Sequence, residues 1–501
     1  MDPNQPISAI LVVLIPLLTA FAVPIIGFWR KNLCFYAACT ALAAAFWCAL
    51  HLLIFVHQRG PVDYFLGGWD PPWGIALRID SLNALMGVLV TFLFSLTGIA
   101  SKKSVPLELP LKEAPFYALF LLLFTGLLGM ILTGDMFNLY VFLEVSSLTA
   151  YALIAMGEPG AMVASFRYLL MGTVGASWYL LGVGYLYIVT GTLNMADLSG
   201  LLREMEGSHA VLSGFAFILF GIAIKMALFP LHLWLPDAYA KAPSIVSTTI
   251  APIMTKVMAY VLIRIGFTVF HPEYVVQAAK ASGLLVWFGI LAILFGGISA
   301  LSQTDFKRML AFIIVAEVGY IVGGIGIANP TALKGAIFHI VNDAVMMASL
   351  FLVGMMVTHR TGGHGINHFF GIFRKMPLTA IVFTIGALAV IGVPPTCGFF
   401  SKWYLLLGGI EAGHWAFVAA LLVCTLINVA LFFRVFDKGL YLHAKAPQSI
   451  PEPRIDALTI QEAPLGMLVV GGILAAGILA IGIGNSFIVK TLILPAVPGG
   501  L

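Results

Sequence analysis

Fourteen apolar stretches, each about as long as a membrane-spanning helix, constrain most strongly what this chain can fold into. A helix needs about 20 predominantly apolar residues to cross the hydrocarbon core of a bilayer. With 61% hydrophobic and only 10% charged residues, the composition excludes an ordinary soluble domain. We therefore predict an all-α polytopic membrane protein with spans near residues 7–29, 33–56, 80–100, 114–133, 136–157, 163–190, 210–235, 243–269, 274–300, 309–328, 332–357, 377–401, 412–435 and 465–490.

The lysines and arginines segregate between the two sides of this arrangement. Sixteen of the 26 fall in loops on one side, seven fall on the other, and three lie inside spans. The positive-inside rule then predicts a multi-pass protein of the cell inner (plasma) membrane with both termini outside. The first apolar stretch is expected to be a retained span. The polar stretch 436–463 is expected to be a cytoplasmic connector with a short surface helix.

Two of the three lysines inside spans lie beside a break in their helix. Lys225 precedes Pro230, and Lys402 follows the segment PPTCG. A charged lysine at the bilayer centre costs about 2.5–3.5 kcal/mol even on the gentler scales. Interrupted helices at corresponding points of two halves indicate the ion path of a transporter. This pattern predicts that the chain moves charge across a membrane.

Two further ionisable residues lie deep in predicted spans. Glu144 is about nine residues from each end of its span, and Lys256 lies one span beyond Lys225. A glutamate and a lysine that approach and separate form a proton switch, because each stabilises the charged form of the other. The alternatives are a neutral packing carboxyl at Glu144 and, for Lys256 and Lys402, an ammonium that extends to the membrane interface.

A histidine and two more carboxyls complete the set of candidate residues. His339 and Asp343 are four residues apart and share one face of a helix. Histidine titrates near about pH 6.5, which suits a proton relay, and an adjacent aspartate would hold it charged. The alternative is a satisfied polar pair between two helices. Glu317 is another buried carboxyl, whose role the residues alone do not assign.

No sequence pattern indicates a cofactor or a metal ion. The five cysteines form no CxxC pair, and no GxGxxG, P-loop or HExxH pattern occurs. His359, His364 and His368 are interpreted as solvated loop residues rather than a metal site. The net charge of +4 is too small to indicate nucleic acid. Redox chemistry would therefore have to come from partner subunits, and this chain is not expected to be an enzyme by itself.

Four sequence blocks resemble one known group of transporters. They are GDMFNLYVFLEVSSLTAYALIA, YIVTGTLNMADL, KMALFPLHLWLPDAYAKAPS and TDFKRMLAFIIVAEVGY. They resemble the D-type subunit of Mrp-type cation/proton antiporters, within the wider family of antiporter-like subunits of respiratory complex I and membrane-bound hydrogenases. The resemblance covers roughly residues 75–435. The block PLHLWLPDAY with its preceding lysine is its most specific part.

The resemblance implies roles for five residues along a polar axis at the midplane of the membrane. It matches Glu144 and Lys225 to a glutamate–lysine pair, Lys256 to the lysine of span eight, His339 to a relay histidine and Lys402 to the lysine of span twelve. It further implies two inverted five-helix repeats, spans 4–8 and 9–13, with spans 7 and 12 broken. The expected divisions are an N-terminal three-helix segment, two proton half-channels, and a connector with the last helix, at residues 1–112, 113–270, 271–436 and 437–501.

The chain departs from the family pattern in span eleven. Asp343 and Met347 stand where relatives usually have a histidine and a lysine, and Glu317 replaces a more usual glutamine or similar polar residue. The predicted axis thereby loses one base and gains two acids. An altered relay, ion preference or coupling in the second half is the expected consequence.

Three hypotheses for function follow. The first is a proton-translocating subunit of a multi-subunit monovalent cation/proton antiporter, with other membrane subunits as partners and protons and cations as cargo. The second is a proton-pumping subunit of a redox-driven complex. The third is a structural subunit with a disabled channel, which the buried ionisable residues argue against.

Overall fold

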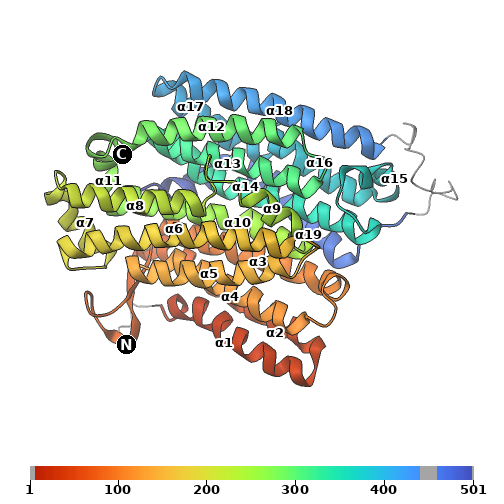
Figure 1. The fold of residues 1–501 in the computed structure, drawn as a ribbon, viewed down its shortest axis with the longest axis horizontal. Helices are drawn as coiled ribbons and strands as arrows, with labels where there is room; N and C mark the ends of the chain where they lie inside the picture. The colour runs from red at the N-terminus through yellow and green to blue at the C-terminus, as the bar shows by residue number, and fades with distance from the viewer. Residues whose placement is uncertain (1–5, 441–459, 499–501) are drawn as a thin grey trace.

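The computed structural model describes residues 6–440 and 460–498, and it shows a bundle of long, roughly parallel and antiparallel helices (Figure 1). Within these ranges twelve helices are long and apolar enough to cross a membrane. Two further spans are each built from two shorter helices, as described below. The predicted polytopic fold of about 14 transmembrane helices is confirmed.

The first part of the chain forms three spans and a short hairpin. Its elements are α1 (Ser8–Trp29), α2 (Lys31–Arg59), β1 (Val62–Phe65), β2 (Ala76–Ile79) and α3 (Ser81–Glu108). Strands β1 and β2 pair antiparallel, with Val62 opposite Ile79. The hairpin was not predicted, because two four-residue strands are too short to show a clear alternation of apolar and polar residues.

The next helices follow one another across the bundle. They are α4 (Glu113–Leu132), α5 (Met136–Ala155), α6 (Ala161–Thr190), the short α7 (Met195–Leu202), α8 (His209–Lys225), α9 (Leu235–Lys241) and α10 (Ser244–Ile263). Residues 133–135 separate α4 from α5, as predicted. Helix α8 ends at Lys225 itself, and the chain resumes as α9 only ten residues later, so span seven is broken.

The remaining helices continue the same up-and-down course. They are α11 (His271–Glu273), α12 (Ala281–Leu301), α13 (Phe306–Ile327), α14 (Pro330–Thr361), α15 (Ile372–Lys375), α16 (Pro377–Ile391), α17 (Cys397–Glu411), α18 (Trp415–Leu440), α19 (Leu465–Ile483) and α20 (Asn485–Ile488). Span twelve consists of α16 and α17 with a break between them. The connector predicted at 436–463 lies mostly outside the described residues.

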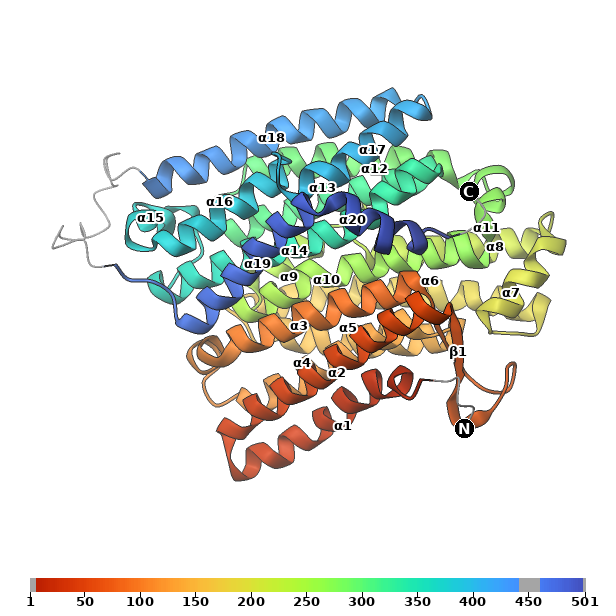
Figure 2. The same ribbon diagram turned by 180° about the vertical axis from the view of Figure 1, so that it is seen from behind.

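The bundle has two distinct ends, which we name by their contents. The hairpin face carries β1 and β2, α7 and α11, and both ends of the described chain approach it (Figures 1 and 2). The basic face is the opposite end, with α15 and the turn between α5 and α6. Its loops hold the larger share of lysine and arginine.

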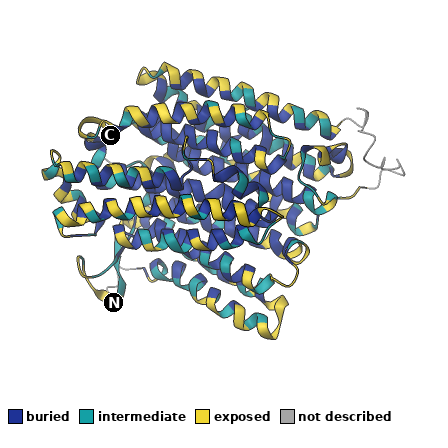
Figure 3. Ribbon diagram, in the orientation of Figure 1, coloured by how far each residue is buried: buried dark blue, intermediate teal, exposed yellow. Residues whose placement is uncertain are grey.

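The centre of the bundle consists of α10, in which every residue is buried, and α14, which is buried without interruption from Gly335 to Val357 (Figure 3). Around them, glycines let neighbouring helices approach closely, as is typical of helix packing in membranes. A Cβ placed on Gly221 of α8 would lie 2.6 Å from the carbonyl oxygen of Gly175 in α6. The same distance separates a Cβ on Gly319 of α13 from the carbonyl oxygen of Gly289 in α12. Charged side chains on α10 and α14 are therefore enclosed by protein.

Candidate functional site: a series of buried ion pairs

The first site lies at the break in span seven. Lys225 is the last residue of α8, and its side chain points toward α5. Its Nζ lies 3.5 Å from Oε1 of Glu144 and donates hydrogen bonds to Ser147 Oγ at 2.7 Å and to Tyr151 at 3.4 Å. The lysine is 3% exposed, whereas Glu144 is 23% exposed. The predicted glutamate–lysine pair therefore exists, and the lysine has neutral hydroxyl partners beside its carboxylate.

The second site joins the two central helices. Lys256 of α10 and Asp343 of α14 form an ion pair, with Nζ 2.5 Å from Oδ2 and both side chains at most 1% exposed. Because the Lys256 side chain is buried and paired with Asp343, its ammonium does not extend to the membrane interface. The spacing of four residues favoured Asp343 as the carboxylate beside His339. The structure corrects this expectation, because Asp343 faces α10 and its ion-pair partner is Lys256.

The third site lies at the break in span twelve. One carboxyl oxygen of Glu317, on α13, lies within hydrogen-bond distance of His339 Nε2, at 2.6 Å. Its other oxygen lies 3.7 Å from Nζ of Lys402. His339 Nδ1 contacts Ser401 Oγ at 2.9 Å, and Lys402 donates to the carbonyl oxygen of Val390 at 2.5 Å. Lys402, on α17, is buried rather than at the surface.

The three sites have the same basic composition. Each contains a buried lysine and a carboxylate on a neighbouring helix: Lys225 with Glu144, Lys256 with Asp343, and Lys402 with Glu317. Both acids that depart from the family pattern are paired with a cation. Each of these three lysines thus has a counter-charge within 4 Å, which is how membrane proteins accommodate buried charges.

Sequence reasoning weighed Ser147 only as a partner of Glu144 and assigned no hydroxyl group to Lys225 or His339. Ser147 and Tyr151 accept hydrogen bonds from Lys225, and Ser401 contacts His339. Serine and tyrosine are common in membrane helices, so no pattern in the sequence singled them out. Glu317 had a signal, a charge within an apolar run, but no assigned partner.

A separate charged cluster lies at the basic face, around His364. Its Nε2 lies 2.8 Å from Glu158 in the turn between α5 and α6, and its Nδ1 contacts Asp305, the N-cap of α13. The histidine thereby connects two parts of the chain far apart in sequence. The interpretation of His364 as a solvated loop residue is wrong, because its side chain is only 20% exposed and is held between two carboxylates.

The His364 cluster predicts a specific dependence of stability on pH. Hydrogen bonds to Asp305 and Glu158 raise the pKa of His364 to about 9. Because the folded pKa lies above the unfolded value of about 6.5, the contribution is complete below about pH 6.5 and is lost as the pH rises through 9. We expect His364→Gln to lower the melting temperature of the purified complex at pH 6–7 and to have little effect at pH 10. A difference that stays constant from pH 6 to pH 10 would contradict this account.

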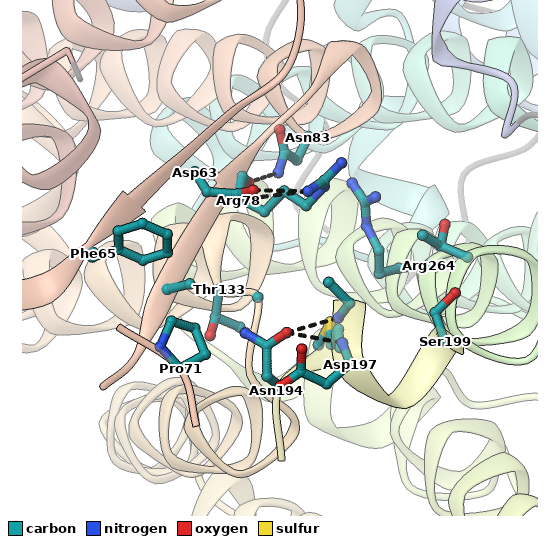
Figure 4. Close-up of a pocket in the computed structure, with 15 residues that line it drawn as sticks. Asp63, Phe65, Pro71, Arg78, Asn83, Thr133, Asn194, Asp197, Ser199 and Arg264 are labelled. Atoms are coloured by element: carbon teal, nitrogen blue, oxygen red, sulfur yellow. Dashed lines mark hydrogen bonds and ion pairs between the residues drawn. The ribbon is translucent and has the colours of Figure 1, made fainter. Parts of the chain in front are cut away.

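Among the residues that the structure describes, no group of three or more histidine, cysteine, aspartate or glutamate side chains is placed to hold a metal ion. A pocket with several charged lining residues does occur at the hairpin face (Figure 4), with a volume of about 410 Å³. It contains Asp63, Arg78, Asn83, Asp197 and Arg264 among its lining residues. This pocket lies at the end of α10, away from the three lysine sites.

The fold and the buried ion pairs define a polytopic membrane protein with ionisable groups in its interior. Comparison with known proteins shows the family. Residues 133–428 match the model of the family described as NADH:quinone oxidoreductase/Mrp antiporter, TM. The chain therefore belongs to this family of membrane subunits.

Individual relatives come from both branches of the family. The N-type subunit of NADH-quinone oxidoreductase from Desulforudis audaxviator is 44% identical over 98% of both chains. The D-type subunit of the Na(+)/H(+) antiporter from Bacillus subtilis is 31% identical over 85% of both chains. A chain in the solved Mrp complex of Dietzia sp. DQ12-45-1b is 25% identical, with a TM-score of 0.87 over 98% of this chain and 97% of that one. The solved structures that share this fold belong to named complexes, among them the Mrp complex and an archaeal respiratory membrane complex.

Proposed function

We propose that this chain carries protons across the membrane along its three lysine–carboxylate pairs, as one subunit of a larger membrane complex. The observation that carries the proposal is the recurrence of the pair: each of the three lysines has one carboxylate on another helix within 4 Å. Two of the three lysines also lie at a helix break. A merely structural subunit would have no need for three such costly pairs.

The physics of a buried pair explains how it would move a proton. Separating the carboxylate from a buried lysine destabilises the charged ammonium, so the lysine releases its proton to a neighbouring base. Lys225 would exchange a proton with Lys256 as its contact with Glu144 tightens or loosens. His339 would pass it between the central pair and Lys402. A membrane potential of 100 mV supplies about 2.3 kcal/mol per charge to such a transfer.

Two larger machines could contain this subunit. The identity of 44% over nearly the full length of a NADH-quinone oxidoreductase subunit favours a redox-driven proton pump. The sequence blocks quoted above, and the 31% identity with an antiporter subunit of the D type, favour a monovalent cation/proton antiporter. We propose the redox-driven pump as the first candidate, because its relative matches more of the chain at higher identity. The antiporter is the second.

The identity of the partner subunits distinguishes these two candidates. The tagged chain is purified in mild detergent from its native membrane, and its partners are identified by mass spectrometry together with iron analysis. Iron-bearing soluble subunits in stoichiometric yield support the redox-driven pump. Several small membrane partners without iron, and one larger relative of this chain, support the antiporter and overturn the first candidate.

The proposed location is the plasma membrane, with the basic face in the cytoplasm. The excess of lysine and arginine in the loops of that face supports this orientation. Both termini would then lie outside, at the hairpin face.

A further inference from the structure

The central helix α10 carries polar groups along one stripe from its middle to the hairpin face. Lys256, Tyr260 and Arg264 are four residues apart in succession, so they lie one above another on the same side of the helix. Lys256 belongs to the proposed proton path. Arg264 lies two turns beyond it, a rise of about 12 Å. A helix that is buried throughout thus connects the lysine axis with one end of the molecule.

Arg264 is fixed at the end of this stripe by hydrogen bonds on three of its nitrogen atoms. Its Nη1 and Nη2 donate to the two carboxylate oxygens of Asp80, at 2.6 and 2.8 Å. Its Nε donates to the hydroxyl of Tyr260 at 3.2 Å, and that hydroxyl in turn donates to the carbonyl oxygen of Ile131 at 2.6 Å. The side chain of Arg264 is only 7% exposed.

Asp80 is itself held in place by the start of α3. Its carboxylate accepts hydrogen bonds from the backbone N–H groups of Leu82 and Asn83, and the side chain of Asn83 binds the Asp80 N–H in return. The helix N-terminus favours this negative charge. The guanidinium is therefore anchored to a rigid acceptor, and neither group is free to swing aside.

The pocket at the hairpin face adjoins Arg264 (Figure 4). Arg264 is part of its lining, together with a second arginine, Arg78. Arg78 pairs with Asp63 at 2.9 Å, but these side chains are 41% and 39% exposed. The lining of the pocket thus includes an exposed ion pair, Arg78–Asp63, and Arg264 as the buried member of the second pair.

We propose that the positive charge of Arg264, which Asp80 holds in place, is an electrostatic seal that separates the lysine axis from the pocket at the hairpin face. A guanidinium does not release its proton in proteins, so it cannot act as a relay. A fixed arginine also repels protons and other cations from a narrow path. This inference rests on the proposed proton path, because a seal has meaning only if α10 belongs to a conducting axis.

The seal accounts for a feature that simple anchoring leaves unexplained. An anchor between α3 and α10 could use apolar side chains, since replacing a buried ion pair by well-packed apolar residues is often neutral or stabilising. A permanent positive charge between Lys256 and this pocket would instead hinder a proton from leaving the lysine axis through the pocket. The position of Arg264, buried on the axis side and lining the pocket on the other, fits that role.

The test measures passive proton leak of the purified complex in liposomes. A potassium diffusion potential is imposed with valinomycin, and an enclosed pH dye reports proton movement without substrate. Arg264→Gln removes the charge and leaves the Asp80 carboxylate in the path. We expect a leak about tenfold faster than in the wild type, equivalent to a barrier lower by about 1.4 kcal/mol. Arg264→Lys keeps the charge and should remain tight.

Arg78→Gln is the matched control, because Arg78 lines the same pocket but lies on its exposed side. It should leak no more than the wild type. Asp80→Asn tests the same idea should Arg264→Gln fail to assemble: it retains the charge at position 264 and is expected to stay tight. An assembled Arg264→Gln variant that leaks protons no faster than the wild type contradicts the proposed seal. A faster proton leak in Asp80→Asn or Arg264→Lys also contradicts it.

Failure of the seal is distinguishable from failure of the proposed function. If Arg264→Gln is tight but driven transport still depends on Lys225, the seal is wrong and the proton path stands. If driven transport does not depend on Lys225, the proton path itself is wrong whatever the leak assay shows.

Discussion

Replacing Lys225 with alanine is expected to reduce proton translocation by about a hundredfold or more, which is the usual scale for losing a positioned proton-transfer group. Lys225 is the cation of the first pair, and its Nζ is held by Glu144 and Ser147. Without it, Glu144 loses its counter-charge and Lys256 loses the neighbour with which it would exchange protons. The measurement is substrate-driven acidification of everted membrane vesicles that contain the assembled complex.

Lys241→Ala is the control for this experiment. Lys241 ends α9, on the other side of the same break, and none of the three ion pairs includes it. Its loss should leave translocation within about twofold of the wild type, since single surface changes rarely alter more than about 0.5 kcal/mol. Equal losses in the two variants would indicate damage to the broken span rather than loss of a proton carrier.

Asp343→Asn is expected to destabilise the protein by about 3–5 kcal/mol, which is typical of breaking a buried ion pair by removing one partner. Asp343 and Lys256 join the two central helices, and both are at most 1% exposed. The substitution keeps the size of the side chain but leaves the ammonium of Lys256 without a counter-charge. Thermal unfolding of the purified complex, followed by the loss of partner subunits, measures the effect.

The double variant Lys256→Met, Asp343→Leu separates stability from transport. Replacing both charges with apolar groups of similar size should restore most of the stability. Translocation should nevertheless stay lost, because the central proton carrier is gone. A double variant that pumps at the wild-type rate would remove the Lys256–Asp343 pair from the proposed path. One that stays as unstable as Asp343→Asn would show that the pair is not the cause of the destabilisation.

The fold could be predicted well from the sequence, because the bilayer imposes a simple rule on helix length and composition. Apolar stretches indicated the spans, and Pro230 and the segment PPTCG indicated the two breaks. The β1–β2 hairpin and α7 were not predicted, since both are short and lie outside the apolar stretches. The close contacts between helices at glycine residues also could not be predicted from the sequence, because it does not show which helix faces meet.

The candidate site could be predicted residue by residue but not pair by pair. Lys225, Lys256 and Lys402 stand out because a charge in an apolar run is costly and rare. Their partners lie on other helices, and sequence spacing carries no information about which faces meet. The Lys256–Asp343 pair shows this limit, because the spacing of four residues favoured a neighbour on the same helix instead.

The most direct test of the proton path is proton translocation by Lys225→Arg in everted vesicles, compared with the wild type at equal content of assembled complex. Arginine keeps the positive charge beside Glu144 but does not release its proton. If the proton passes through Lys225, the variant assembles with its partners and translocation falls to background. If the arginine variant translocates protons at the wild-type rate, Lys225 supplies only charge, and the proton takes another path.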